Sequence, residues 1–245
     1  MANTIIELKN VSFAAQSQVI VRDFSLKFEE GKTTALIGPP GCGKSTVLKL
    51  CAGLLVPDSG EVIFRGKDVF NMNRQENIAF RKEAAMVFQD SALWANQSLF
   101  QCLELPLRVH FPKMYARERE NRIHFVLNDV GYKRDLSIRP SQLSMGEQKL
   151  IAFARAMMCF PKLLYLDEWT ESLDDTAAQR LVDLVKRHQY ENKTVILVSH
   201  NLRIIKTMAD YVVMIIEGQL SGQYTRKQIN EDENLARYVE KGIAS

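Results

Sequence analysis

A glycine-rich loop between an apolar run and a helical run constrains this chain more than any other feature. Thr33–Ile37 precedes the loop, and Ser45–Leu55 follows it with helical periodicity. Strand, glycine loop and helix in this order form a phosphate cradle, because glycines let backbone N–H groups approach an anion at the helix N-terminus. The loop fits the pattern G-x-x-x-x-G-K-[ST], which predicts a nucleoside-triphosphate site. Its predicted nucleotide-binding residues are Gly38, Pro39, Pro40, Gly41, Cys42, Gly43, Lys44, Ser45 and Thr46.

Two carboxylates follow a second apolar run. They supply the metal ligand and the water-polarising group that a nucleoside-triphosphate site needs in addition to its phosphate-binding loop. Leu163–Leu166 is followed directly by Asp167 and Glu168. Adjacent acids after a strand are often only a loop or a helix cap. Next to a phosphate loop they indicate that Asp167 and the Ser45 hydroxyl ligate Mg²⁺, while Glu168 polarises the attacking water. Lys44 places a positive charge near the β- and γ-phosphates.

Two further polar residues end apolar runs at positions suited to ligand binding. Gln89 follows Met86–Phe88, and His200 follows Val195–Val198 and one serine. Ligands of open α/β sheets bind beyond the carboxyl ends of the strands, so both residues are predicted to be catalytic and Gln89 also to ligate the metal. The remaining histidines lack such a context and are expected at the surface: His110, His124 and His188.

A second anion-binding motif lies far from the first. Leu143–Gln148 is a serine and glycine turn that precedes a helical run, so it offers a hydroxyl and unpaired N–H groups. Ser144, Gly146 and Glu147 are its predicted nucleotide-binding residues. One nucleotide needs only one phosphate cradle. The pair of motifs therefore predicts that two copies of the chain complete each other's sites.

Composition excludes several other classes of protein. The chain has 245 residues, and its 32 basic and 29 acidic residues leave a net charge of only +3 without a cationic stripe, so no nucleic acid partner is expected. No apolar run is long enough to span a bilayer, and the first ten residues lack a signal-peptide pattern. Four scattered cysteines without C-x-x-C spacing favour reduced thiols over a zinc site or disulfides.

The order of the predicted elements indicates an α/β fold. Predicted parallel strands alternate with helices, and residues 91–160 change to helical periodicity interrupted by Pro106, Pro112 and Pro140. We expect one domain over residues 1–245, with an α/β core (1–90 and 161–225), a helical lobe (91–160) and a helical tail (226–245). The predicted strands are Ile5–Leu8, Val19–Phe28, Thr33–Ile37, Val62–Phe64, Met86–Phe88, Leu163–Leu166, Val195–Val198 and Val212–Ile216.

Along nearly its whole length the chain resembles ABC-type ATPase domains, with the motifs in the family's order. Gly38–Ser45 matches the Walker A loop, Gln89 the Q-loop, Leu143–Gln148 the signature, Leu163–Asp167 Walker B and His200 the switch histidine. The resemblance implies a P-loop NTPase core with a mainly parallel sheet, an N-terminal antiparallel β element and an inserted helical lobe. It also implies an ATPase that uses ATP and Mg²⁺, and a homodimer that closes head to tail around two ATP molecules.

The chain departs from the family pattern at several positions. An aromatic residue usually stacks on adenine where this chain has Ala15, so Phe13, two residues earlier on the same strand face, is the candidate for base contact. Met145 occupies a usual glycine position of the signature. Trp169 stands where proline is common, and Leu150 where a basic residue is common. These departures indicate a slower ATPase, because the catalytic residue types are all present.

The segment after Gln89 bears on what the ATPase drives. It is rich in apolar side chains, and in transporters of this family the corresponding groove receives a helix of the membrane subunit. An integral-membrane permease is therefore expected to dock near Gln89–Phe111, with the chain cytoplasmic and peripheral on the inner face of the cell membrane. Pro106–Arg108 and Asp232–Val239 look similar to Mce/Mla-type lipid-transport ATPases. The alternative is a soluble ABC ATPase that acts as an assembly or regulatory factor, of the iron–sulfur scaffold or cell-division type.

Overall fold

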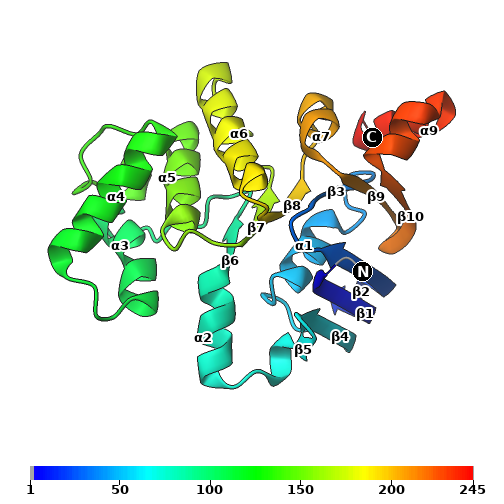
Figure 1. Ribbon diagram of the computed structural model, residues 1–245, viewed down its shortest axis with the longest axis horizontal. Coiled ribbons are helices and arrows are strands. Elements are labelled where there is room, and N and C mark those ends of the chain that lie inside the picture. Colours follow the sequence, from blue (N-terminus) through cyan, green and yellow to red (C-terminus); the bar gives the residue numbers. More distant parts are fainter. Residues whose placement is uncertain (1–2, 245) are drawn as a thin grey trace.

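The computed structural model describes residues 3–244, and the side chains of residues 3–242. A six-stranded sheet with the order β10-β9-β3-β8-β7-β6 forms its centre (Figure 1). All neighbouring strands in it are parallel except β9 and β10, which form an antiparallel edge. Its strands are β3 (Thr33–Ile37), β6 (Ala84–Val87), β7 (Leu163–Asp167), β8 (Thr194–Val198), β9 (Tyr211–Ile216) and β10 (Gln219–Thr225).

A second, antiparallel sheet with the order β2-β1-β4-β5 lies at one end of the molecule (Figure 1). Its first hairpin turns at Gln16 and Ser17, which both have positive φ angles. The strands are β1 (Thr4–Ala15), β2 (Gln18–Glu29), β4 (Ser59–Phe64) and β5 (Lys67–Asp68). This sheet is the predicted N-terminal antiparallel element.

Helices surround the central sheet, and α3, α4 and α5 gather at the end opposite to the antiparallel sheet (Figure 1). Among residues 3–244, no helix is both long and apolar enough to cross a membrane. The helices are α1 (Lys44–Cys51), α2 (Arg74–Glu83), α3 (Leu99–His110), α4 (Ala116–Val130), α5 (Met145–Met157), α6 (Asp175–Tyr190), α7 (Leu202–Met208), α8 (Arg226–Glu231) and α9 (Glu233–Ala244), with short 3₁₀ turns at Val69–Asn71 and Pro140–Gln142.

Alternating side chains of the central strands build two separate cores. In β3, Ala35 and Ile37 face the core shared with α3 to α7, while Leu36 faces the core shared with α1 and the antiparallel sheet. Every residue of β3, β7 and β8 is buried, as expected for parallel strands covered on both faces. The sheet therefore holds the antiparallel element on one side and the helical lobe on the other.

The carbonyl groups that end α1 are satisfied by side chains from distant segments. The Tyr165 hydroxyl donates to the carbonyl of Cys51 at 2.8 Å. The Arg81 guanidinium donates to the carbonyls of Ala52 and Gly53 at 2.6 and 2.7 Å. The last carbonyls of a helix have no intrahelical partner, so these bonds fix the end of α1 against β7 and α2. The helix that follows the phosphate loop is thereby anchored at its far end.

The predicted α/β fold class is confirmed, and the structure corrects several details. β10 was not predicted, because its sequence is polar and contains a glycine, as an exposed edge strand permits. Pro106 was expected to interrupt a helix but lies inside α3, whose buried face packs against the core through Leu99, Leu103 and Leu107. The predicted helical tail consists of two helices, α8 and α9. The predicted division into core, lobe and tail stays a prediction.

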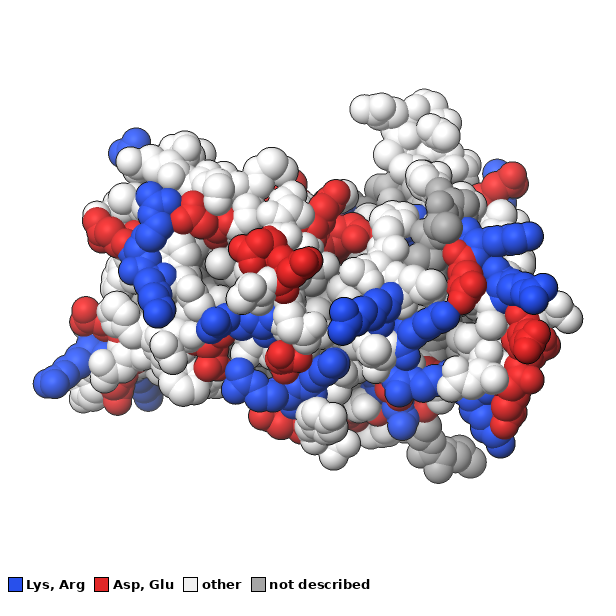
Figure 2. All heavy atoms as spheres, turned by 90° about the horizontal axis from the view of Figure 1, so that it is seen from above, with Lys and Arg blue, Asp and Glu red and all other residues white. Residues whose placement is uncertain are grey.

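Charged side chains of both signs are interspersed on the face of the molecule shown in Figure 2. Nearly all salt bridges recorded among residues 3–242 include at least one exposed side chain, and some join two, such as Lys9 to Glu61 and Lys227 to Glu231. Exposed ion pairs of this kind contribute little to stability. The two apolar cores therefore provide most of the stabilisation of this fold.

The expectation that His188 lies at the surface was wrong. His188 belongs to the buried face of α6 and is only 2% exposed. Neither of its ring nitrogens has a hydrogen-bond partner. Burial, with a smaller contribution from Lys193, lowers the pKa of His188 from 6.5 to about 4. The helical periodicity from Leu181 to His188 places the imidazole ring on the apolar face of α6. The burial of His188 was therefore predictable from the sequence.

This buried histidine predicts a loss of stability in mild acid. Because its pKa is depressed in the folded state, the unfolded chain takes up the proton first as the pH falls below 6.5. We expect His188 to reduce the free energy of unfolding by about 2 kcal/mol between pH 7 and pH 5. Urea unfolding of the wild type and of His188→Gln at both pH values tests this.

The comparison of the wild type with His188→Gln isolates the effect of His188, because the other titrating groups are the same in both proteins. Among these groups, burial raises the pKa values of Asp167 and Glu168. Those two carboxyl groups bind protons more readily when folded, so their contribution changes with pH in the opposite direction. Equal pH dependence in the two proteins would show that His188 is not held neutral by burial.

Candidate nucleotide-binding site

The glycine-rich loop leaves the sheet at Ile37 and enters α1 at Lys44, and backbone packing requires two of its glycines. Gly38 has a φ of 146°, and a Cβ atom there would lie 2.0 Å from the carbonyl oxygen of Ile215. Gly43 precedes α1 with a φ of 99°, and a Cβ atom there would lie 2.9 Å from a carbonyl oxygen of β2. The loop is thus enclosed by backbone, with the unpaired N–H groups of the α1 N-terminus available to an anion.

The side chain of Lys44 folds back over this loop. Its ammonium group is buried and donates to the carbonyls of Gly38 and Pro39 at 2.8 and 3.0 Å. The Cys42 sulfur lies 4.0 Å away. These bonds hold a full positive charge inside the cradle, where a triphosphate would carry its negative charge.

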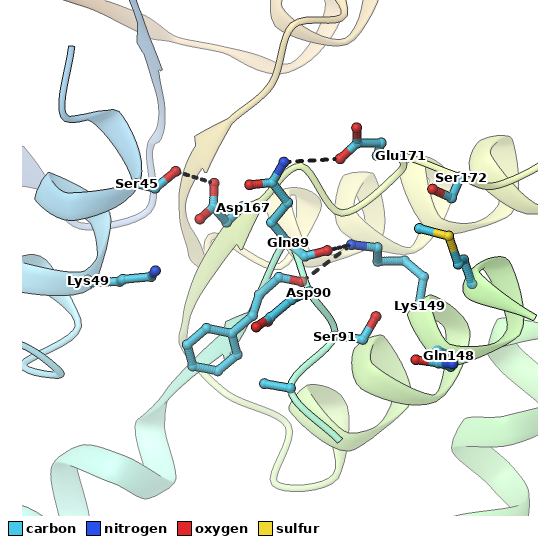
Figure 3. A pocket seen from close by; sticks show the side chains of 13 residues that line it. Ser45, Lys49, Gln89, Asp90, Ser91, Gln148, Lys149, Asp167, Glu171 and Ser172 are labelled. Carbon is cyan, nitrogen blue, oxygen red and sulfur yellow. Dashed lines mark hydrogen bonds between the residues drawn. The ribbon is translucent and has the colours of Figure 1, made fainter. Parts of the chain in front are cut away.

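Ser45 and Asp167 meet at the carboxyl edge of the central sheet. The Ser45 hydroxyl donates to Asp167 Oδ1 at 2.9 Å (Figure 3). Asp167 is buried, and burial raises its pKa against the opposing effects of Ser45 and nearby lysines. A hydroxyl and a carboxylate are oxygen donors that suit Mg²⁺, which completes its shell with phosphate oxygens and water. Held there by Ser45 and Asp167, Mg²⁺ would neutralise negative charge on the phosphates.

Glu168 directly follows Asp167 and contacts His200. Its Oε1 lies 3.5 Å from His200 Nε2, and the backbone N–H of His200 also bonds to the carboxylate. Burial raises the pKa of Glu168, while His200 opposes the rise. Glu168 has a φ of 44°, a region that costs a non-glycine residue about 1–3 kcal/mol. This arrangement suits a carboxylate that is held in place to orient water.

Gln89 lies across a cleft of about 650 Å³ from Ser45 (Figure 3). Its Nε2 donates to Glu171 Oε2 at 3.3 Å. The cleft is lined by α1, the loop after β6, the start of α5 and the segment after β7. The structure therefore brings Gln89, Ser45 and Asp167 to one cavity.

The signature residues begin α5 on the other side of that cleft. The Ser144 hydroxyl caps α5 by accepting from the backbone N–H of Glu147 at 3.2 Å. A Cβ atom on Gly146 would lie 2.9 Å from the carbonyl oxygen of Ser172, so the turn needs glycine there. Among the described residues, the recorded hydrogen bonds of Ser144 and Glu147 do not reach the glycine-rich loop.

Other predicted site residues have local roles in the structure. Both carboxylate oxygens of Glu147 are engaged, one by Ser144 and the other by Arg134 at 2.7 Å. Phe13 is half-buried and packs against the core around the antiparallel sheet. Thr46 is half-buried in α1, and Pro40 and Gly41 are exposed. The roles in nucleotide binding predicted for these residues stay predictions.

Four charged residues of the cleft were not predicted from the sequence: Lys49, Asp90, Lys149 and Glu171. Lys49 follows Ser45 by four positions on α1, a spacing that places both side chains on one helix face. Lys149 lies among the buried apolar residues of α5, and it is only 3% exposed. That charge within a buried helix was the available signal.

Comparisons with known proteins agree with this geometry. A family model described as ABC transporter matches residues 21–171. The intermembrane phospholipid transport system ATP-binding protein MlaF of Haemophilus influenzae is 33% identical over 96% of this chain and 89% of its own length. The spermidine/putrescine import ATP-binding protein PotA of the same organism is 34% identical over 96% of this chain and 62% of its own length. The nickel import ATP-binding protein NikE of Brucella suis is 36% identical over 84% of this chain and 79% of its own length.

Solved structures show the same architecture. The dimeric ATP-binding cassette MJ0796 in a post-hydrolysis state, bound to ADP and Pi, superimposes with a TM-score of 0.83. It is 25% identical, and the match covers 91% of this chain and 99% of that one. Fold and site together define a P-loop ATPase domain. The chain belongs to the ABC transporter family, and it is an ATPase that binds ATP with Mg²⁺.

The site geometry predicts different effects for its two central charges. Glu168→Gln keeps the shape of the side chain but removes the charge that polarises water, so ATP hydrolysis should fall ~10²–10⁴-fold while ATP still binds. Lys44→Ala removes the cation from the cradle, so both binding and hydrolysis should be lost. ATP affinity by calorimetry and phosphate release measure the two effects.

Glu191→Gln is the matched control, because it makes the same chemical change at an exposed residue after α6. It should leave both quantities unchanged. Loss of ATP binding in Glu168→Gln would assign Glu168 to metal binding or structure instead of catalysis.

Proposed function

We propose that this chain is the ATP-hydrolysing subunit of a membrane transporter that moves a lipid. The support for lipid is the match to MlaF, a phospholipid transport protein, over 96% of this chain. Relatives that import spermidine, putrescine or nickel match with similar identity, so family membership alone does not select the cargo. The observation that carries the transport function is an apolar groove beside the nucleotide cleft.

This groove has a volume of about 590 Å³ and lies between the segment after α1, β6, α3 and α5. Four large apolar side chains line it while remaining 40 to 51% exposed, which is unusual on a protein surface. Part of its lining falls within the predicted docking segment Gln89–Phe111. The exposed apolar residues of the groove are Leu54, Trp94, Leu105 and Val109.

The shape and chemistry of the groove suit an amphipathic helix of an integral-membrane permease. Arg155 stacks on Trp94 at 5.2 Å, and Arg81 also lines the groove, so an acidic residue on the helix would be accommodated at its edge. Docking on a permease would place this chain on the cytoplasmic, inner face of the cell membrane as a peripheral subunit.

We further propose that two copies close head to tail around two ATP molecules. The N-terminal turn of α5 is open to solvent, with Met145 71% exposed. The start of α5 lies across the cleft from Ser45 of its own chain. A second copy would bring this turn to the phosphates, and the structural neighbour MJ0796 is a dimer bound to ADP and Pi.

The groove predicts a separation between hydrolysis and transport. Val109→Glu places a charge in the docking groove, so the permease should no longer co-purify with the chain. ATP hydrolysis by the isolated chain should be unchanged, because Val109 lies outside the nucleotide cleft. Membrane extraction followed by affinity capture of the tagged chain measures the association, and lipid analysis of the captured complex identifies the cargo.

Val19→Glu is the matched control, since Val19 is equally exposed but lies in β2 of the antiparallel sheet. It should still capture the permease. If the wild type captures soluble proteins and no membrane subunit, the chain is an assembly or regulatory ATPase. A captured permease whose complex transports polyamines or metal ions would reject the lipid cargo.

A further inference from the structure

The loop between β6 and the helical lobe has an unfavourable backbone conformation. Residues 88–92 lead from the sheet toward Trp94 and include Gln89. Ser91 and Ala92 have φ angles of 63° and 44°, in the left-handed region that non-glycine residues seldom adopt. Two consecutive residues in this region persist only where surrounding contacts hold them.

Two cations of α5 hold this loop through its carbonyl groups. Lys149 Nζ donates to the carbonyls of Gln89 and, at 3.4 Å, Phe88 (Figure 3). The Arg155 guanidinium donates to the carbonyls of Ala92 and Ser91 at 2.6 and 3.2 Å. Hydrogen bonds from charged donors are about twice as strong as neutral ones. The loop is therefore fastened to the same helix that begins with the signature turn.

Lys149 is the more unusual of the two, because it is an almost fully buried lysine. Burial lowers its pKa, while the carboxylates of Glu171, Asp167 and other nearby acids oppose the change. A buried ammonium persists when it is paired and hydrogen-bonded. Here it bonds to backbone carbonyls and lies in the field of the carboxylates that surround the metal site.

We propose that Lys149 is a positioning residue that fastens the loop carrying Gln89 to α5 and thereby holds Gln89 at the metal site. This inference rests on the proposed role of Gln89 as a ligand of Mg²⁺.

Electrostatics and positioning predict opposite results when Lys149 is replaced. Removing a cation near the metal site would by itself strengthen Mg²⁺ binding. Releasing the loop would weaken Mg²⁺ binding, because Gln89 would no longer be held in place. In Lys149→Met we expect the Mg²⁺ concentration for half-maximal ATP hydrolysis to rise about tenfold, the effect typical of losing a hydrogen bond to a charged group.

A second readout does not depend on activity. Amide hydrogen exchange of residues 88–92 in the nucleotide-free protein should become about tenfold faster in Lys149→Met, since the carbonyl contacts that hold the loop are lost. Lys149→Arg should restore both properties, because it keeps the charge and the donors. Lys149→Gln, a smaller polar change, should give an intermediate result and serves if Lys149→Met does not fold.

Lys162→Met, at an exposed lysine before β7, should behave as the wild type. The inference is overturned if Lys149→Met and Lys149→Gln leave the Mg²⁺ requirement unchanged or lower it, or leave exchange in the loop unchanged. Gln89→Ala separates this failure from a failure of the proposed function. If Gln89→Ala raises the Mg²⁺ requirement and Lys149→Met does not, only the positioning role is wrong; if neither does, the role of Gln89 is wrong as well.

Discussion

The hydrogen bond between Ser45 and Asp167 joins residues that are 122 positions apart, and the nucleotide site depends on it. The register of the central sheet makes it possible. Leu36 of β3 lies opposite Val198 of β8, and Val198 lies opposite Asp167 of β7. The ends of β3 and β7 are therefore level, so the glycine-rich loop and the buried carboxylate meet at one edge of the sheet. A shift of one residue would turn these side chains to the other face.

Several charges are buried around this bond, and each is paired. Lys44 bonds to loop carbonyls, Asp167 to Ser45, and Lys149 to the carbonyls of the loop after β6. Removing the hydrogen-bond partner of a buried charged group leaves that group unsatisfied, which commonly destabilises a protein by about 1–3 kcal/mol or more. The chemistry of the site therefore rests on a few individual bonds. The remainder of the fold relies on two extensive apolar cores.

Helix α5 connects the two functional surfaces of the molecule. Its first turn carries the signature serine and glycine, Lys149 lines the nucleotide cleft, and Arg155 lines the apolar groove. Arg155 also stacks on Trp94, an exposed residue of that groove. A displacement of α5 would thus reach the metal site and the proposed permease site together. Helix α5 would therefore couple ATP binding in the cleft to the proposed membrane partner in the groove.

Much of this account could be predicted from the sequence. The motifs after Ile37, Leu166 and Val198 were recognisable because parallel strands are uniformly apolar and their carboxyl ends share one edge. Strand β10 was not predictable, since an edge strand needs no apolar pattern. Lys149 was missed because its partners are backbone carbonyls, which leave no trace in the sequence. His188 was wrongly predicted to be exposed. It does not follow an apolar strand as His200 does, and a histidine outside such a position was expected at the surface.

The central claim is that the signature turn of one chain serves the phosphates bound by another. Cysteine cross-linking tests it most directly, with Ser45→Cys in one chain and Ser144→Cys in a differently tagged chain. The four native cysteines are replaced, and Mg²⁺ is omitted because Ser45 is a proposed metal ligand. The account predicts a disulfide between the two chains that forms with ATP and not without it. The same cross-link formed equally without ATP, or no cross-link between chains with any triphosphate, would contradict it.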